Sequence, residues 1–250
     1  MERKEKVSIG IIGAGEIATS THIPLLSCLN NINIKYVADI KTPEVPIKIE
    51  KIKIESPGAL PECDVMLLTT PVGVREEYIR EFGARKAYIL TEKPFAVNIE
   101  MHKRLLGYTD KITANYMRIY YSSIQQIKEI VTSGVFGKLN AIDIKEGGIV
   151  GKTKKGKEHY QTRSEISGGG ILMESGCHTL SQLTHILNDH TFLVKQSEVE
   201  YLNNYDTDIQ ARIKATKGKQ VIPISYNLSL IRPIRTESVY YFDNAMLSFN

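Results

Sequence analysis

A glycine-containing turn near the N-terminus limits the fold of this chain more than any other feature. The segment KVSIGIIGAGEIATSTHIPLLSCL begins as a short apolar strand, continues through Gly13 and Gly15, and ends in a helical pattern of apolar residues. Glycine at 13 allows a tight turn, glycine at 15 lets backbone approach a pyrophosphate, and the small Ala18 lets the helix pack on the strand. The segment therefore predicts the dinucleotide-binding end of a parallel α/β sheet, with a purely structural glycine turn as the alternative.

An acidic residue at the end of the next predicted strand supports dinucleotide binding. Asp39 ends the strand INIKYVADI, 24 residues after Gly15. A carboxylate in this position accepts both ribose hydroxyls of NAD and repels the 2′-phosphate of NADP. We therefore expect NAD. Lys41 follows two residues later and could attract the 2′-phosphate, which keeps NADP as the alternative. Glu16 and Ile17, at the start of the helix, join the expected cofactor-binding residues because free N–H groups there attract phosphate.

The remainder of the N-terminal half alternates strands and helices. DVMLLTTP, RKAYILTEKP and KITANYM have the apolar character of buried strands, and helical patterns occupy residues 74–82 and 99–106. This alternation is typical of a parallel sheet. The segment 41–62 contains four prolines and a charged middle, so we predict a short or absent crossover helix there.

The pattern changes after residue 118. A helix at SSIQQIKEIVTSGVFG precedes a series of β-like runs separated by short polar turns, which indicates an antiparallel sheet, and the helical segment GGGILMESGCHTLSQLTHIL lies among them. We therefore expect two domains, residues 1–118 and residues 119–250. The predicted fold class is α/β, with an N-terminal parallel sheet and a C-terminal domain built on a mostly antiparallel sheet.

Composition excludes several classes of function. The 250 residues carry a net charge of +4 with lysines scattered among glutamates, which does not suit a nucleic-acid-binding protein. There is no apolar run long enough to cross a bilayer, and the basic N-terminus lacks the apolar core of a signal peptide, so we expect no membrane partner and a cytoplasmic location. Cys28, Cys63 and Cys177 fit neither a disulfide framework nor a zinc pattern, and we expect no metal.

Two further motifs carry groups that can move protons. TEKPFA places Glu92 and Lys93 just past the carboxyl end of a buried strand, at the edge where parallel sheets bind ligands. A partly desolvated lysine can exchange protons near neutrality, although a surface lysine is the alternative. GGGILMESGCHTL places Glu174 and His178 four apart on one predicted helical face, where they can meet a common ligand or form an ordinary exposed pair.

The motifs GAGEIA, TEKP, NYMR and GGGILMESGCH, in this order and spacing, resemble the Gfo/Idh/MocA family of dehydrogenases. The resemblance implies a Rossmann domain followed by an α/β domain whose open, mostly antiparallel sheet often makes oligomer contacts, and hence a homo-oligomer. It implies an oxidoreductase that transfers hydride between NAD(P) and a hydroxyl or keto carbon. The expected substrate is a sugar, a polyol or a sugar derivative, including derivatives that carry a nucleotide or an acid.

The same resemblance suggests roles for individual residues. Lys93 matches the family's EKP lysine, Glu174 its usual aspartate and His178 its usual histidine, so these three are the expected catalytic residues. His178 is the expected general base and Lys93 the hydrogen-bond donor to the substrate hydroxyl, with the reverse assignment as the alternative. The Lys93–Pro94 bond is expected to be cis. The predicted cofactor-binding residues are Gly13, Gly15, Glu16, Ile17, Asp39, Thr70, Pro71, Glu92 and Lys93.

Four residues are assigned to the substrate. Asn115 and Arg118 match the family's N-x-x-R stretch after the last Rossmann strand, and Lys152 and Arg163 lie in the basic loop GKTKKGKEHYQTR, which is either solvated or in contact with a phosphate or carboxylate. Glycines 168–170 would let backbone pass close to substrate or cofactor. His22 is expected to be a structural hydrogen-bonding residue.

Two other functions remain open at this level. One is a nicotinamide-binding sensor or partner subunit without turnover. It suits four features: Glu174 is longer than the family aspartate, Ser181 replaces a second family aspartate, segment 41–62 is expected to lack a full helix, and the sequence ends at NAMLSFN, where relatives usually continue. Within enzymes, the alternative is a member that uses NAD during elimination or epimerisation, or that reduces a C=N bond.

Overall fold

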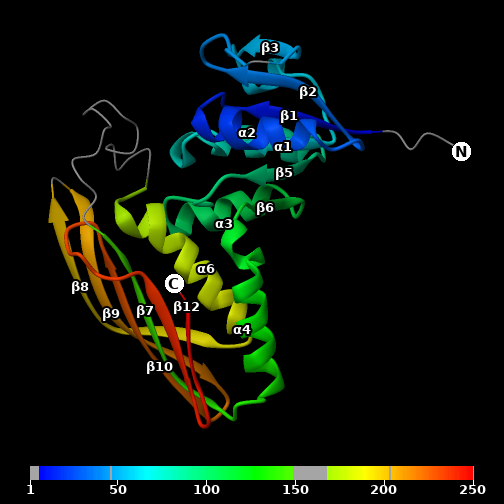
Figure 1. Ribbon diagram of the computed structural model, residues 1–250. Coiled ribbons are helices and arrows are strands. Elements are labelled where there is room, and N and C mark those ends of the chain that lie inside the picture. Colours follow the sequence, from blue (N-terminus) through cyan, green and yellow to red (C-terminus); the bar gives the residue numbers. More distant parts are fainter. Residues whose placement is uncertain (1–5, 46, 149–167, 203, 250) are drawn as a thin grey trace, which may run out of the picture. The chain divides into compact units, whose positions relative to one another are not determined.

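The computed structural model describes residues 6–45, 47–148, 168–202 and 204–249. The chain divides into two compact units, Met1–Asn115 and Tyr116–Asn250. Each unit contains its own sheet and its own buried apolar core, labelled by element in Figure 1. No helix in the described ranges is long and apolar enough to cross a bilayer.

The described part of the N-terminal unit is built on a parallel sheet of six strands in the order β3-β2-β1-β4-β5-β6. All five neighbouring pairs are parallel, and this strand order is that of the Rossmann fold. The order reverses between β1 and β4, which is the point where such sheets bind dinucleotides. The strands are β1 (Val7–Ile12), β2 (Ile32–Asp39), β3 (Glu50–Lys53), β4 (Val65–Leu68), β5 (Tyr88–Thr91) and β6 (Ile112–Ala114).

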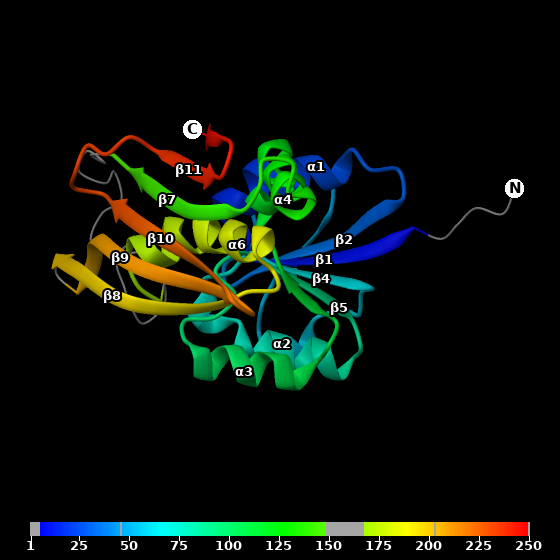
Figure 2. The same cartoon turned by 90° about the horizontal axis from the view of Figure 1, so that it is seen from below.

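Helices cover both faces of this sheet, as Figure 2 shows, with α1 on one side and α2 and α3 on the other. A π-helical turn (Ala18–His22) and α1 (Ile23–Ser27) follow β1, whereas α2 (Glu76–Ala84) and α3 (Ile99–Tyr108) follow β4 and β5. Fully buried Ile79 and Phe82 of α2 pack on one face, and Ile23 packs on the other. Asn98 caps α3, because its side chain accepts a hydrogen bond from the Met101 N–H at 2.8 Å.

The segment between β2 and β4 has no crossover α-helix among its described residues, as the prolines predicted. It contains a strand that the sequence analysis missed, β3, and a 3-10 turn (Pro57–Ala59). All four residues of β3 pair in parallel with β2, opposite Tyr36 to Asp39. A second 3-10 turn (Val72–Val74) precedes α2, and a third (Met117–Tyr120) opens the C-terminal unit.

The C-terminal unit has a mixed six-stranded sheet in the order β12-β11-β7-β10-β9-β8 within the described ranges. Only β7 and β10 pair in parallel; the other four pairs are antiparallel. The strands are β7 (Leu139–Gly147), β8 (Thr191–Leu202), β9 (Tyr205–Lys217), β10 (Gln220–Ser229), β11 (Glu237–Phe242) and β12 (Met246–Phe249). The last two are joined by a bend at Asp243 and Asn244. The predicted fold class is confirmed in both halves.

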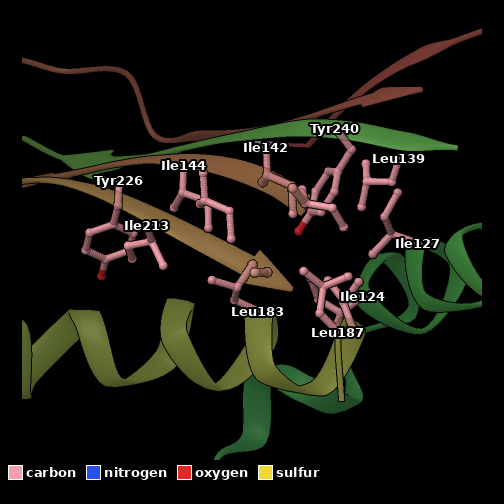
Figure 3. Packing of buried hydrophobic residues seen from close by; sticks show 14 of the residues in the cluster. Ile124, Ile127, Leu139, Ile142, Ile144, Leu183, Leu187, Ile213, Tyr226 and Tyr240 are labelled. Carbon is pink, nitrogen blue, oxygen red and sulfur yellow. The ribbon is translucent and has the colours of Figure 1, made fainter. Parts of the chain in front are cut away.

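Two helices bury one face of this second sheet. They are α4 (Ser122–Ser133), which ends at Gly134 with φ +66°, and α6 (Cys177–Ile186), which continues from a π-helical turn (Leu172–Gly176). Figure 3 shows Leu183 between α6 and the strands, with Ile124 and Ile127 of α4 to one side of it, and all three belong to one buried cluster with Leu187. This packing fixes α6, which carries the predicted catalytic residue His178, against the strands.

Candidate functional site

The two glycines of the N-terminal turn have different reasons for being glycine. Gly13 has φ +101°, and a Cβ there would lie 2.9 Å from Thr69 Oγ1 and 3.0 Å from the Thr70 backbone N. The fold itself therefore requires Gly13. At Gly15, in contrast, a Cβ would meet no described atom within 4 Å, and the φ angle is not left-handed. The space beside Gly15 is open, as the approach of a pyrophosphate requires.

Asp39 lies beside this turn. Its Oδ2 accepts a hydrogen bond from the Ala14 N–H at 2.6 Å, across 25 residues of sequence. An ionised carboxylate has about four acceptor positions, so this bond leaves room for ribose hydroxyls. The structure therefore joins the glycine turn to the acidic residue that the sequence analysis paired with it.

Glu92, immediately after β5, is the centre of a hydrogen-bonded group. Its Oε1 accepts from His22 Nε2 at 2.7 Å and from Asn115 Nδ2 at 2.8 Å, and its Oε2 accepts from the Lys93 N–H at 3.2 Å. Because an ionised carboxylate only accepts, His22 carries its proton on Nε2 in this pair. His22 is thus a structural hydrogen-bonding residue, as predicted, and it connects the helix after the glycine turn to the ends of β5 and β6.

The surroundings of Glu92 favour its charged form. The residue is 9% exposed, and burial alone raises the pKa of its carboxyl. The hydrogen bonds from His22 and Asn115 outweigh burial and hold the Glu92 pKa below its usual range. Glu92 is therefore a carboxylate at neutral pH, placed directly before the predicted catalytic lysine.

Lys93 is half-buried in the turn that follows β5, and the Lys93–Pro94 bond is cis, as predicted. The neighbouring loop after β4 contains Thr70 and Pro71. Arg75, only 2% exposed, joins the two loops. Its guanidinium donates to the Thr70 carbonyl from Nε at 3.0 Å and from Nη2 at 2.7 Å, and Nη1 donates to the carbonyls of Glu92 and Pro94. Sequence reasoning missed Arg75, because an arginine at the start of an amphipathic helix has the pattern of an exposed residue.

In the C-terminal unit, the glycine run fits against the start of β9. Gly168 and Gly169 have φ of +84° and +148°, and a Cβ on Gly170 would lie 2.2 Å from the Asp206 backbone O. The Asp206 carboxylate accepts from the backbone N–H groups of Gly170 and of Leu172, the latter at 2.8 Å. The sequence analysis assigned the run to a nearby ligand; for Gly170, the structure gives the contact with Asp206 as the reason. A carboxylate there also interacts favourably with the helix N-terminus.

Glu174 lies in the π-helical turn and His178 in the first turn of α6. This arrangement differs from the single α-helical face that the sequence predicted, because a π-turn closes its hydrogen bonds over one more residue. Glu174 Oε2 accepts from the Tyr205 hydroxyl at 2.9 Å. Burial, followed by the Glu174 charge, raises the Tyr205 pKa, so the phenol stays protonated and donates. Tyr205 lies 31 residues from Glu174 and belongs to no motif, so the sequence analysis did not identify it.

His178 is buried, with 8% of its surface exposed, and the Ser181 hydroxyl donates to its backbone carbonyl at 2.7 Å. Ser181, which occupies the position of a second family aspartate, is therefore turned to its own helix. Lys93 belongs to the N-terminal unit, and Glu174 and His178 belong to the C-terminal unit.

The four predicted substrate residues have different positions. Asn115 contacts Glu92, and Arg118 forms an ion pair with Glu146, with Nη1 3.0 and 3.2 Å from the two carboxylate oxygens. Lys152 and Arg163 lie outside the described residues. The assignment of all four to a substrate stays a prediction.

Residues 7–118 match the family described as an oxidoreductase family with an NAD-binding Rossmann fold. The chain is 23% identical over 194 residues to an uncharacterized oxidoreductase, YrbE, of Bacillus subtilis, covering 73% of this chain and 54% of that protein. It is 23% identical over 193 residues to D-glucoside 3-dehydrogenase of Escherichia coli, covering 72% and 53%. The chain thus spans about half the length of these curated relatives. The nicotinamide cofactor expected from the sequence is the one that the family description names.

Solved structures share the fold. An oxidoreductase from Thermotoga maritima superposes with a TM-score of 0.85 at 17% identity, covering 98% of this chain and 78% of that one. The WlbA dehydrogenase of Bordetella pertussis, solved with NADH and UDP-GlcNAcA, gives a TM-score of 0.81 at 16% identity, covering 98% and 79%. The order of the two sheets along the chain is therefore an arrangement already known in dehydrogenases.

Proposed function

We propose that this chain, a member of the Gfo/Idh/MocA family of oxidoreductases, transfers hydride between NAD and a hydroxyl or keto carbon of a sugar, polyol or sugar derivative. The observation that carries the proposal is the open space at Gly15. Described packing explains the glycine at 13 and leaves the one at 15 unexplained. A bound pyrophosphate would explain it, because only a residue without a Cβ lets phosphate oxygens reach the backbone N–H groups.

The N-terminal unit would hold the cofactor across the carboxyl ends of its strands. In the proposed arrangement, Gly13–Ile17 contact the pyrophosphate and Asp39 accepts the adenosine ribose hydroxyls. Thr70, Pro71, Glu92 and Lys93, on the loops after β4 and β5, would contact the nicotinamide half. We propose that the N-terminal unit, which ends at Asn115, three residues before the predicted boundary at 118, binds the dinucleotide, and that the C-terminal unit binds the substrate and makes oligomer contacts.

A bound nicotinamide would accept or supply the hydride, and the chain's own residues would handle the proton. His178 is proposed to take the hydroxyl proton in the oxidation direction. Lys93 would donate a hydrogen bond to the same oxygen and stabilise its developing charge. Glu174, whose carboxylate is oriented by Tyr205, would position the substrate or the imidazole.

The substrate class is supported by the names of relatives. They include D-glucoside 3-dehydrogenase of Escherichia coli and scyllo-inositol 2-dehydrogenase (NADP(+)) of Bacillus subtilis. The two names describe dehydrogenases of a glucoside and of an inositol. We therefore propose a sugar or polyol ring, bound with the help of Asn115, Arg118, Lys152 and Arg163.

The second candidate is a nicotinamide-binding protein without turnover. It is favoured by Ser181, whose hydroxyl bonds to its own helix where the family usually has a charged aspartate. The two candidates separate in one assay: a screen of sugars and polyols with NAD+ and NADP+ produces NAD(P)H only if the chain is an enzyme.

Substitution at Gly15 tests the cofactor site. Gly15→Ala and the bulkier Gly15→Val should leave the thermal midpoint unchanged, because the added atoms enter open space. Both should weaken NADH binding in a fluorescence titration by about tenfold or more, equivalent to about 1.4 kcal/mol. Gly107→Ala, which also enters open space but in α3, is the control and should bind NADH normally. Unchanged NADH affinity in both Gly15 variants would contradict the proposed pyrophosphate position.

Asp39 tests the choice of cofactor. Asp39→Asn keeps an oxygen for the Ala14 N–H and removes the charge that repels a 2′-phosphate. The ratio of NADPH to NADH affinity should therefore rise by about tenfold, as expected when a charge–charge repulsion of roughly 1.4 kcal/mol is lost. Lys41→Gln should shift the ratio in the opposite direction. A ratio that does not move in Asp39→Asn would place the adenosine ribose elsewhere.

A further inference from the structure

Arg75 holds three backbone carbonyls that belong to two different loops. Thr70 follows β4, whereas Glu92 and Pro94 follow β5, and the Arg75 guanidinium donates hydrogen bonds to the carbonyl oxygens of all three. Glu92 and Pro94 are the residues on either side of Lys93. One side chain therefore fixes the backbone before and after the lysine relative to the neighbouring loop.

The chemistry of arginine suits this task. The guanidinium is planar, is always charged and presents five N–H donors in a rigid fork. Here Nε and Nη2 both donate to the Thr70 carbonyl oxygen, at 3.0 and 2.7 Å, and Nη1 donates to the Pro94 carbonyl oxygen at 2.6 Å. At 2% exposure, Arg75 is screened from water, which strengthens these bonds and fixes their geometry.

The two loops that Arg75 joins lie on one side of the point where the strand order reverses. The glycine turn and Asp39 lie over β1 and β2, and the Thr70 and Lys93 loops follow β4 and β5. In a sheet of this order, a dinucleotide places one mononucleotide half on each side of the reversal. The loops held by Arg75 therefore correspond to the nicotinamide half.

We infer that Arg75 is a positioning residue. It holds the nicotinamide-binding loops and Lys93 in place relative to one another and does not contact the adenosine half of the cofactor. This inference rests on the proposed function. It predicts that loss of Arg75 weakens the hold on nicotinamide selectively. A residue that only stabilised the fold would affect both halves of the cofactor alike.

The test compares two ligands by isothermal titration calorimetry: NADH, and ADP-ribose, which lacks nicotinamide. Arg75→Met should lower NADH affinity by about tenfold, an effect comparable with the loss of one charge-assisted hydrogen bond. ADP-ribose affinity should change less than about twofold. The fluorescence enhancement of bound NADH, which reports the surroundings of the nicotinamide, should also fall.

The matched control is Arg85→Met. Arg85 also donates to backbone carbonyls, those of Leu60 and Gly58, but it lies between the end of α2 and the start of β5, and its partners precede β4. It should leave the NADH to ADP-ribose affinity ratio unchanged. If Arg75→Met does not fold, Arg75→Lys keeps the charge without the planar fork and should still lower the ratio.

Each remaining outcome contradicts the inference in a recognisable way. An equal loss of NADH and ADP-ribose affinity in the Arg75 variants would assign Arg75 to stability alone. A wild-type ratio in Arg75→Lys would show that charge, not the fork, is sufficient. Failure of the unaltered protein to bind either ligand would instead overturn the proposed function, and the inference with it.

Discussion

Exchange of Lys93 for methionine is expected to lower kcat by about 10² to 10⁴-fold, the usual effect of removing a group that assists proton transfer. Methionine keeps an unbranched apolar stem, so the half-buried position stays filled. The Lys93 backbone N–H also still donates to Glu92, because this bond does not involve the side chain. NADH affinity should therefore stay within about twofold. The measurement is steady-state kinetics on the sugar or polyol that gives turnover in the screen.

His178 supplies the comparison for this result. His178→Ala should lower kcat by a similar factor if the imidazole is the general base. Glu174→Gln should act mainly on KM, because an amide oxygen still accepts from the Tyr205 hydroxyl. Near-normal kcat in both Lys93→Met and His178→Ala would exclude the proposed proton-transfer pair and favour a protein that binds nicotinamide without turnover.

Local patterns were sufficient to predict the fold of both units. Apolar strands separated by helical periodicity predicted the parallel sheet, and consecutive strands with polar turns predicted the mixed one. Strand β3 was missed because its residues, EKIK, carry charges that are typical of an exposed loop. Its pairing with β2 comes from backbone hydrogen bonds along a sheet edge, which require no apolar side chains.

The candidate site was predictable only where its residues lie in one local motif. Gly13, Gly15 and Asp39 were found because a strand, a turn and a helix fix their spacing. Contacts between residues distant in sequence were not predicted. His22 and Glu92 are 70 residues apart, and Gly170 and Asp206 are 36 apart. Contacts of this kind depend on which strands become neighbours, and a single sequence does not record that.

Arg75 illustrates the same limit from another direction. Its position before an amphipathic helix gives it the pattern of a solvent-exposed charge. Only the tertiary structure shows that the helix begins next to the loops after β4 and β5, where three backbone carbonyls accept hydrogen bonds from Arg75. Whether an arginine is buried thus depends on where unpaired backbone acceptors lie.

A substitution in the glycine run before the proposed catalytic helix is expected to have a large effect on stability. A methyl group on Gly170 would lie 2.2 Å from the backbone O and 2.6 Å from the backbone N of Asp206. Both atoms belong to β9, which is paired with β8 at Asp206 itself and with β10 from Asp208 onward, so the strand cannot move away at low cost. The added methyl would also push the Gly170 N–H from the Asp206 carboxylate, which caps the helix start.

Gly170→Ala is therefore expected to destabilise the C-terminal unit by about 3 kcal/mol or more, at the upper end of overpacking effects. This corresponds to a fall of roughly 6–12 °C in the thermal midpoint of that unit. Urea unfolding followed by circular dichroism measures it, with separate transitions fitted if the two units unfold independently. Gly107→Ala, where the methyl meets nothing within 4 Å, should be neutral or stabilising. A Gly170→Ala midpoint equal to that of the unaltered protein would show that the helix start can shift away from Asp206, and Glu174 and His178 would then not be held by this contact.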